Sequence, residues 1–215
     1  MHRTYTALLA LTVLLAWFTL FCDQIETLDN GIVRKTIESA NSGIVDSYGI
    51  HRYGTRINAS TTFLRWDDKS SPCSNERNVA ALHGRCQAIH TMGSVMYGSV
   101  VILTLALVAA FRDKMVPSVK IMQLKIKTIV PWFVLDAAAV SLFVFLCMIV
   151  DYGRLHKATA QSENNVDGSR SIRVQYGHQF NLAVATLVFM SLWMVVALFM
   201  VIPKSQASSV EQLML

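Results

Sequence analysis

Four apolar blocks separated by polar segments limit what this chain can fold into. Each block is close to the roughly 20 apolar residues that a helix needs to cross about 30 Å of hydrocarbon. The whole chain is 53% hydrophobic and only 15% charged, whereas soluble domains carry about 25% charged residues. We therefore expect an all-α membrane protein, a bundle of four transmembrane helices. The blocks are Thr6–Cys22, His90–Phe111, Ile129–Val150 and Phe180–Ile202.

The first block has two interpretations. It is short and follows a single basic residue, Arg3, which is also the pattern of a cleaved signal peptide. However, the residues from Leu20 to Gln24 do not form the small-residue pattern that signal cleavage requires. We therefore expect a retained membrane anchor.

Charge between the blocks predicts the topology. Five basic residues and one acid lie between the second and third blocks, which places that connection in the cytoplasm by the positive-inside rule. Both termini are then cytoplasmic, and the other two connections are extracellular. The sequon Asn58-Ala59-Ser60 agrees, because it falls in the first outer loop and predicts glycosylation of Asn58. The predicted segments are the cytoplasmic N-terminus with the first span (1–22), extracellular loop 1 (23–89), the second span (90–111), a basic cytoplasmic loop (112–128), the third span (129–150), extracellular loop 2 (151–179), the fourth span (180–202) and a cytoplasmic tail (203–215).

The first outer loop is the only connection long enough to fold by itself. It holds eight basic and eight acidic residues, and short groups of Val, Ile, Thr, Tyr and Phe alternate with Gly and Asn. This pattern predicts short strands joined by turns, and therefore a small, partly β extracellular cap from this loop. In contrast, we expect residues Ser162–Arg173 of the second outer loop to be flexible and the tail to be poorly ordered.

The four cysteines have different settings. Cys73 and Cys86 both lie in the first outer loop, where an oxidising compartment would favour a disulfide between them. Two unpaired thiols are the alternative. Cys22 and Cys147 both lie near the outer ends of spans and could meet, although a free buried cysteine is the more common state.

One acid, Asp136, interrupts the third apolar block. A carboxylate in hydrocarbon is costly, so such a residue can mark a proton or ion pathway or a contact between helices. The alternative is a carboxylate near the cytoplasmic interface, where Lys125 or Lys127 reaches it. The other spans hold no ionisable group at depth, and we therefore favour a structural role.

Motifs of common enzyme sites are absent from the sequence. There is no G-x-S-x-G, P-loop, H-E-x-x-H or C-x-x-C, and the histidines lack metal-ligand spacing. We predict no catalytic residues, no metal and no cofactor. The net charge of +5 comes from dispersed residues, which does not favour nucleic acid as a partner.

Several stretches resemble amastins, tetraspan surface glycoproteins of trypanosomatid parasites. Amastins share four spans, cytoplasmic termini and a large first outer loop with the claudins. The similar stretches are Tyr176-Gly177-x-x-Phe180 before the fourth span, Met148-Ile149-Val150-Asp151-Tyr152 at the end of the third, and Arg85-Cys86-Gln87-Ala88-Ile89 before the second.

The most specific amastin feature is an outer-loop motif with an aromatic-Gly-x-basic core between two cysteines. The segment Ile44–Gly54 is similar to this motif, and its core corresponds to Tyr48, Gly49, Ile50 and His51. Its terminal residues stand where the family has the cysteines, so the disulfide of the motif has no counterpart here. Trp66 and Cys73 are only distantly similar to the tryptophan and paired cysteines of claudins.

The resemblance implies an integral membrane surface glycoprotein that makes cell-surface or membrane contacts. Its expected partners are membrane lipid, a second copy of the chain, or another membrane or cell-surface protein. The alternative is a small transporter, a channel or an auxiliary channel subunit that uses Asp136. An intramembrane enzyme has no supporting motif.

Overall fold

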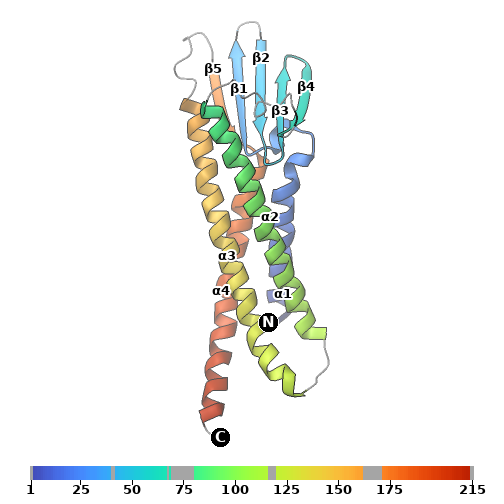
Figure 1. The fold of residues 1–215 in the computed structure, drawn as a ribbon, viewed down its shortest axis with the longest axis vertical. Coiled ribbons are helices and arrows are strands. Elements are labelled where there is room, and N and C mark those ends of the chain that lie inside the picture. Colours follow the sequence, from blue (N-terminus) through green and yellow to red (C-terminus); the bar gives the residue numbers. More distant parts are fainter. Residues whose placement is uncertain are drawn as a thin grey trace.

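The computed structural model describes residues 2–39, 42–66, 68, 80–115, 120–161 and 171–213. Four long helices run side by side, and a β-sheet sits at one end of them (Figure 1). The C-terminus lies at the opposite end of the molecule (Figure 1). The helices are α1 (His2–Phe21), α2 (Ala80–Met115), α3 (Lys120–Gln161) and α4 (His178–Leu213).

The four helices form a bundle in which α1 and α3 each pack against both α2 and α4. Small residues allow close packing in its interior, because Ala106, Ala138 and Ser141 are fully buried. The hydroxyl of Ser141 on α3 donates a hydrogen bond to the Ser99 carbonyl of α2 at 3.4 Å. The bundle predicted from the apolar blocks is therefore present.

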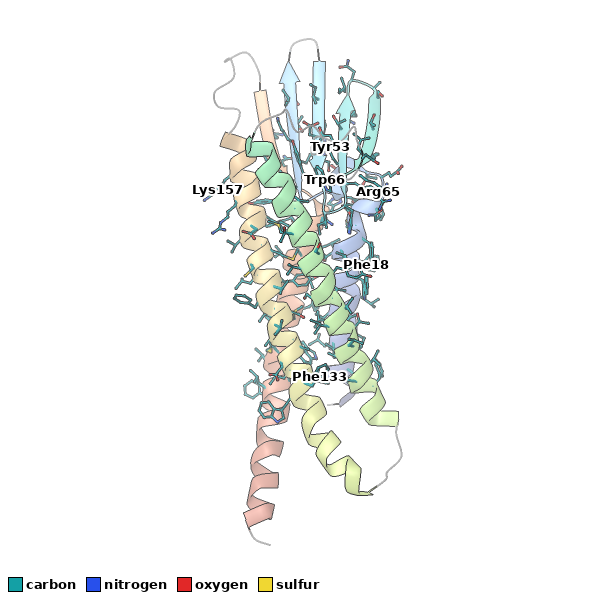
Figure 2. The ribbon with its side chains drawn as sticks, viewed as in Figure 1. Phe18, Tyr53, Arg65, Trp66, Phe133 and Lys157 are labelled. Carbon is teal, nitrogen blue, oxygen red and sulfur yellow. The ribbon has the colours of Figure 1, made fainter. Side chains whose placement is uncertain are left out.

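The outer surface of the bundle carries many large apolar side chains. Phe18 and Phe133 point away from it (Figure 2), and Phe199 is 78% exposed. Each helix has a segment that is long and apolar enough to cross a membrane. A surface of this kind is stable in lipid and not in water, and the chain is accordingly an integral membrane protein. The segments are Tyr5–Gln24, Thr91–Phe111, Trp132–Arg154 and His178–Phe199.

All four helices extend beyond the apolar blocks, α1 only by its first four residues and the other three by more. Helix α2 begins at Ala80, inside the segment assigned to the first outer loop, and α3 extends the third block at both ends. Helix α4 continues to Leu213, so the expectation of a poorly ordered tail is wrong for this stretch. Hydropathy marks only the part of a helix that lies in lipid, whereas backbone hydrogen bonding adds turns to an existing helix at little cost.

The sheet has five antiparallel strands in the order β4-β3-β2-β1-β5. Strands β1 to β4 come from the first outer loop, in agreement with the predicted β content of the cap. Two short 3₁₀ turns connect α1 to the sheet, η1 (Cys22–Gln24) and η2 (Leu28–Asn30). The strands are β1 (Val33–Ser39), β2 (Ser42–Tyr48), β3 (Arg52–Ile57), β4 (Ser60–Arg65) and β5 (Ser171–Tyr176).

The fifth strand corrects the prediction that the cap comes from the first loop alone. Strand β5 belongs to the second outer loop, and it pairs with β1 from Val33↔Tyr176 to Glu38↔Ser171. The predicted flexible segment is therefore extended strand over residues 171–173, while residues 162–170 lie outside the described ones. This pairing provides hydrogen-bond partners for the backbone groups along the edge of β1 that β2 leaves free. A prediction made for each loop separately does not include a pairing between two loops.

One face of the sheet turns toward the helices. Tyr176 of β5 stacks on His156 of α3, with ring centroids 4.4 Å apart, and Val33 and Tyr48 on the same face pack into the core. Directly opposite residues in neighbouring strands share a face, and successive residues along a strand alternate between the two faces. We call the face turned toward the helices the helix face. It contains Val33, Lys35, Ile37, Ile44, Asp46, Tyr48, Tyr53, Thr55, Ile57, Ser60, Thr62, Leu64, Ile172, Val174 and Tyr176.

Candidate functional site

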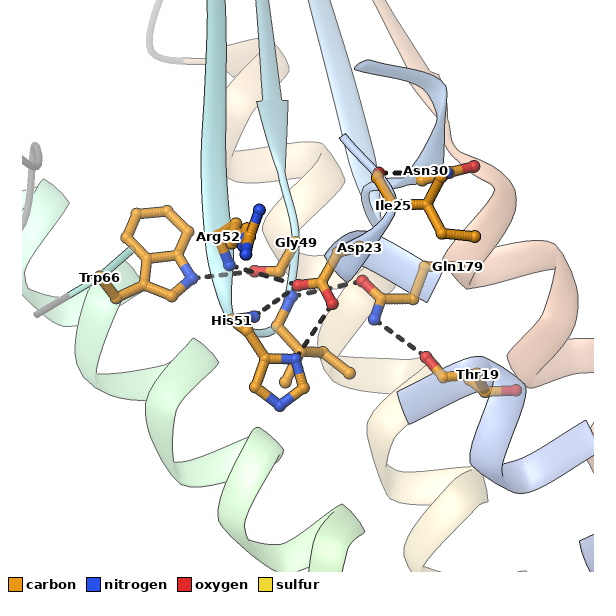
Figure 3. A network of polar contacts seen from close by, with 10 residues as sticks. Thr19, Asp23, Ile25, Asn30, Gly49, His51, Arg52, Trp66 and Gln179 are labelled. Carbon is orange, nitrogen blue, oxygen red and sulfur yellow. Dashed lines mark hydrogen bonds and ion pairs between the residues drawn. The ribbon is translucent and has the colours of Figure 1, made fainter. Parts of the chain in front are cut away.

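Three of the predicted site residues, Tyr48, Gly49 and His51, lie together where β2 turns into β3. This turn is at the end of the sheet that meets the bundle, and its contacts are drawn in Figure 3. The segment that resembles the amastin motif therefore forms the joint between the sheet and the helices. We call the turn, from Gly49 to His51, the docking turn.

A buried carboxylate holds the docking turn. Asp23 lies in η1, directly after α1, and its side chain is only 4% exposed. Its Oδ2 accepts the backbone N–H groups of His51 at 2.5 Å and Arg52 at 3.2 Å, and its Oδ1 lies 3.0 Å from His51 Nδ1. Burying a carboxylate is costly unless donors surround it. These contacts provide the donors and fix the turn to the end of α1.

Gly49 allows the carboxylate to come this close. A Cβ atom at this position would lie 2.5 Å from Asp23 Oδ2 and 2.7 Å from Asp23 Cβ. The backbone of Gly49 is also held, since its N–H donates to the Arg52 carbonyl and its carbonyl accepts from Trp66 Nε1 at 3.1 Å. The glycine of the motif is thus required because Asp23 leaves no room for a Cβ atom. The backbone conformation does not require it, since φ is not positive here.

The next residue of the turn, Ile50, contacts two helices, α2 and α4. Its side chain is buried, and its Cγ2 would lie 2.7 Å from a Cβ atom built at Gly93 of α2. Its N–H donates to Oε1 of Gln179 on α4 at 3.2 Å. Gln179 is fully buried and donates from Nε2 to the Thr19 carbonyl of α1 at 2.9 Å. One side chain therefore bridges the last turn of α1, the first turn of α4 and the sheet.

Aromatic rings continue the joint down the side of α1. His51 stacks on Phe21 at 5.8 Å, and Phe21 stacks on Trp17 at 5.6 Å. Trp17 Nε1 donates to Thr104 Oγ1 of α2 at 3.1 Å, so the column also connects α1 to α2. Tryptophan and tyrosine side chains are typical of the membrane–water interface, which is consistent with an interface near the docking turn.

A second polar pair lies above the turn on the helix face. The Tyr53 hydroxyl donates to Asp46 Oδ1 at 2.7 Å, and the Tyr53 ring packs against Trp66 at 5.9 Å. Burial, and after it the charge of Asp46, raises the pKa of Tyr53 above its ordinary value. The phenol therefore remains a neutral donor to Asp46 over the physiological pH range.

The start of α4 is also held by close backbone packing. The N–H of Gly177 donates to the Ile32 carbonyl at 2.9 Å, and a Cβ atom at Gly177 would collide with the carbonyl of Gly31. The rings of Tyr176 and Phe180 stack at 4.0 Å. Each named residue of the Tyr176-Gly177-x-x-Phe180 stretch thus contributes to the joint between β5 and α4.

The contacts of this arrangement are structural contacts between the sheet and the helices. His51 has a carboxylate partner, but it forms no hydrogen bond to a serine, threonine or cysteine side chain in the described part of the chain. No group of three or more His, Cys, Asp and Glu side chains that could hold a metal occurs among the described residues. What the site can do is hold the sheet in one orientation on the bundle.

The sequon lies at the far end of the sheet from this joint. Asn58 is exposed in the two-residue turn between β3 and β4, with a φ of 55° in the left-handed region that asparagine tolerates. Its side chain is therefore in an accessible turn. Glycosylation of Asn58 stays a prediction.

Asp136 lies on the outside of the bundle. It is exposed on α3, one helical turn after Trp132, at the end of the span away from the sheet. The described residues do not place another ionisable side chain against it. The interfacial interpretation suits this position better than a pathway through the bundle.

The disulfide prediction lies outside the described residues. Cys73 is not described, and the backbone of Cys86 is part of α2 while its side chain is not described. The cysteines that the structure does describe, Cys22 and Cys147, are both free. Cys22 is buried and Cys147 is exposed, so the second cysteine pair considered above does not form.

Sequence reasoning missed the two polar side chains that matter most at the joint. Asp23 directly follows the first apolar block, and Gln179 directly precedes the fourth. One signal could have indicated both: each is a polar residue that directly flanks an apolar block at the predicted outer end. Position alone, however, does not show that they meet the same turn.

Comparisons with known proteins do not identify a family. No protein-family model matches the chain, and no curated protein matches it.

Proposed function

We propose that this chain is an amastin-like surface glycoprotein of the plasma membrane that makes contacts through its sheet. One observation carries the proposal: both outer loops are used to build a single sheet, and buried polar groups fix that sheet to the bundle. A loop that only joins two spans needs neither feature. A fixed platform at one end of a membrane bundle suits the presentation of a surface to a partner.

The far end of the sheet is the part to change in a test. Replacing the whole cap would remove the contacts of the docking turn and unfold the joint, so loss of contact would not be informative. We therefore suggest replacing residues 57–60, the turn between β3 and β4, by a Gly-Ser linker of equal length. Cell adhesion is then compared between cells that display the wild type, cells that display the variant, and cells without the protein.

The expected result is stronger adhesion with the wild type and a loss with the variant at equal surface levels. Surface biotinylation provides the level. If cells that display the wild type adhere no more than cells without it, the contact role is wrong.

Glycosylation and sidedness share one experiment. Ser60→Ala is preferable to a change at Asn58, because it removes the sequon and leaves the asparagine in the left-handed turn. Glycosidase treatment of protein from eukaryotic cells should shift the band of the wild type but not that of Ser60→Ala. Protease protection of the sheet in intact cells would contradict an extracellular location.

A transport function is not favoured by the position of Asp136. In reconstituted liposomes, flux that is present in the wild type and absent in Asp136→Asn would overturn the contact proposal as a complete account. A wild type without flux would remove the alternative.

A further inference from the structure

The sheet face turned away from the helices carries five arginines. Alternation along the strands and the register between them place Arg34, Arg52, Arg56, Arg65 and Arg173 on this face. They come from four strands of both outer loops, so the sequence does not show them as a cluster. We call this surface the arginine face.

The upper part of the arginine face forms one row across all five strands. Arg173 is opposite Thr36, Thr36 is opposite Val45, Val45 is opposite Arg56, and Arg56 is opposite Thr61. Three strand spacings of about 4.8 Å separate the two arginines, or about 14 Å. Both are exposed, and neither forms an ion pair in the described part of the chain.

The lower arginines are partly neutralised. Arg34 pairs with Asp29, and Arg52 pairs with Glu26 at 2.7 Å. Both acids are more than half exposed and come from the connection between α1 and β1. The positive charge without an acidic partner therefore lies in the upper row. Glu38, one row further from the bundle, is the described acid nearest to Arg173 on this face.

No large apolar side chain of the described strands is fully exposed on this face. Phe63 is half-buried there, one row closer to the bundle, where it lies over Gly54 next to Leu28. Among the described residues of the five strands, the exposed large hydrophobic side chains are Ile57 and Tyr176, and both project to the helix face. Val45, between the arginines, is buried. Protein interfaces are usually centred on aromatic or aliphatic anchors, so the face does not fit a protein partner.

The orientation of the face argues against a lipid surface. The strands run roughly along the helix axes (Figure 1), so the arginine face stands upright on the membrane. A second bilayer would approach the far end of the sheet and not this side. An extended chain can lie along an upright face, and guanidinium groups bind sulfate and carboxylate groups through paired hydrogen bonds.

We propose that the arginine face binds a linear sulfated polysaccharide, with Arg56 and Arg173 on sulfate groups and Thr36 and Thr61 hydrogen-bonded to the sugar. This rests on the proposed function, because the face must be extracellular to meet such a polymer. A sulfated polysaccharide would then be the partner in the proposed cell-surface contact.

The test uses the full-length protein in nanodiscs of zwitterionic lipid and immobilised heparin as the probe. Arg56→Ser with Arg173→Ser should weaken binding about tenfold or more, since about 1.4 kcal/mol corresponds to a factor of ten. The dependence of log K on log salt should also become shallower, by about two for two lost contacts. Arg→Lys at both positions should give an intermediate loss, because charge is kept and the planar fork is lost.

Two further variants give matched controls. Lys157→Ser removes an exposed positive charge from α3 (Figure 2), outside the arginine face, and should leave binding unchanged. Glu38→Gln removes the acid above Arg173 and should strengthen binding. Desulfated heparin should bind the wild type much more weakly than heparin does.

The results also separate this inference from the proposed function. Equal binding by the wild type and the double serine variant would overturn the inference, as would a loss with Lys157→Ser of the same size. Preference for phosphatidylserine vesicles over heparin would assign the face to lipid and overturn it too. If the wild type promotes adhesion but does not bind heparin, the inference fails and the contact role stands.

Discussion

The two ends of the sheet contain the same strands but different chemistry. At the bundle end, Asp23 and Gln179 are buried, and each accepts a backbone N–H of the docking turn. At the far end, Arg56 and Ile57 are exposed and the chain turns back through the sequon. The buried polar attachment to the bundle is therefore confined to one end of the strands. Under the proposed contact function, sequence changes at the far end are expected to leave this attachment intact.

The largest effect is expected from Asp23→Ala. The change leaves the partly buried N–H groups of His51 and Arg52 without an acceptor, at a cost of about 1–3 kcal/mol for each group. We therefore expect about 2–6 kcal/mol less stability for the docked sheet. Hydrogen exchange of the peptide that covers residues 44–57 should become fast, while exchange in the spans remains slow.

Asp29→Ala is the matched control. It also removes an acid that pairs with an arginine, but this carboxylate is 54% exposed, and such pairs contribute about 1 kcal/mol or less. Equal acceleration of exchange in the two variants would contradict a special role for Asp23.

A pair of glycines in the same loop gives the next effect. In Gly49→Ala the new methyl group would overlap Asp23, and overpacking of this kind costs about 1–3 kcal/mol. Gly43→Ala, at the far end of β2, meets no atom within 4 Å and should be neutral or slightly stabilising. Thermal unfolding in detergent would show the difference. Similar melting temperatures for both variants would contradict the claim that close packing is confined to the bundle end of the sheet.

Tyr53→Phe should have a smaller effect that depends on pH. The lost hydrogen bond to buried Asp46 costs about 1–2 kcal/mol near neutral pH. In the wild type the pKa of Tyr53 is raised on folding, so the unfolded chain loses its phenol proton first, at about pH 10. The contribution is complete below pH 10 and is lost as pH rises above it. Above pH 10 the free energy of unfolding of the variant should therefore fall less steeply with pH than that of the wild type. The same pH dependence in both proteins would contradict this role of Tyr53.

The smallest effect is expected at the far end. Ile57→Thr changes a side chain that is 53% exposed, and exposed positions away from special contacts usually change stability by about 0.5 kcal/mol or less. Chemical unfolding of wild type and variant should coincide within that range. A loss as large as that of Gly49→Ala would show that the far end also supports the fold.

The sequence was sufficient for the parts that depend on composition along the chain. The four spans follow from hydropathy because hydrocarbon selects continuous apolar segments. The β content of the first loop follows from the alternation of its residues. The docking turn was also marked in advance, since Tyr48, Gly49 and His51 were singled out by their resemblance to the amastin motif, although without the reason for the glycine.

The tertiary structure alone decided what the marked residues do. Ile50 meets Gln179 across 129 positions of sequence, and His51 meets Asp23 across 28. Strand β5 joins the sheet because β1 has a free edge, a property of the folded sheet and not of either segment. The arginines of two separate loops share one face for the same reason, because register places them there. Local pattern fixes which residues can enter lipid or a strand, whereas pairing partners depend on contacts that exist only once the chain has folded.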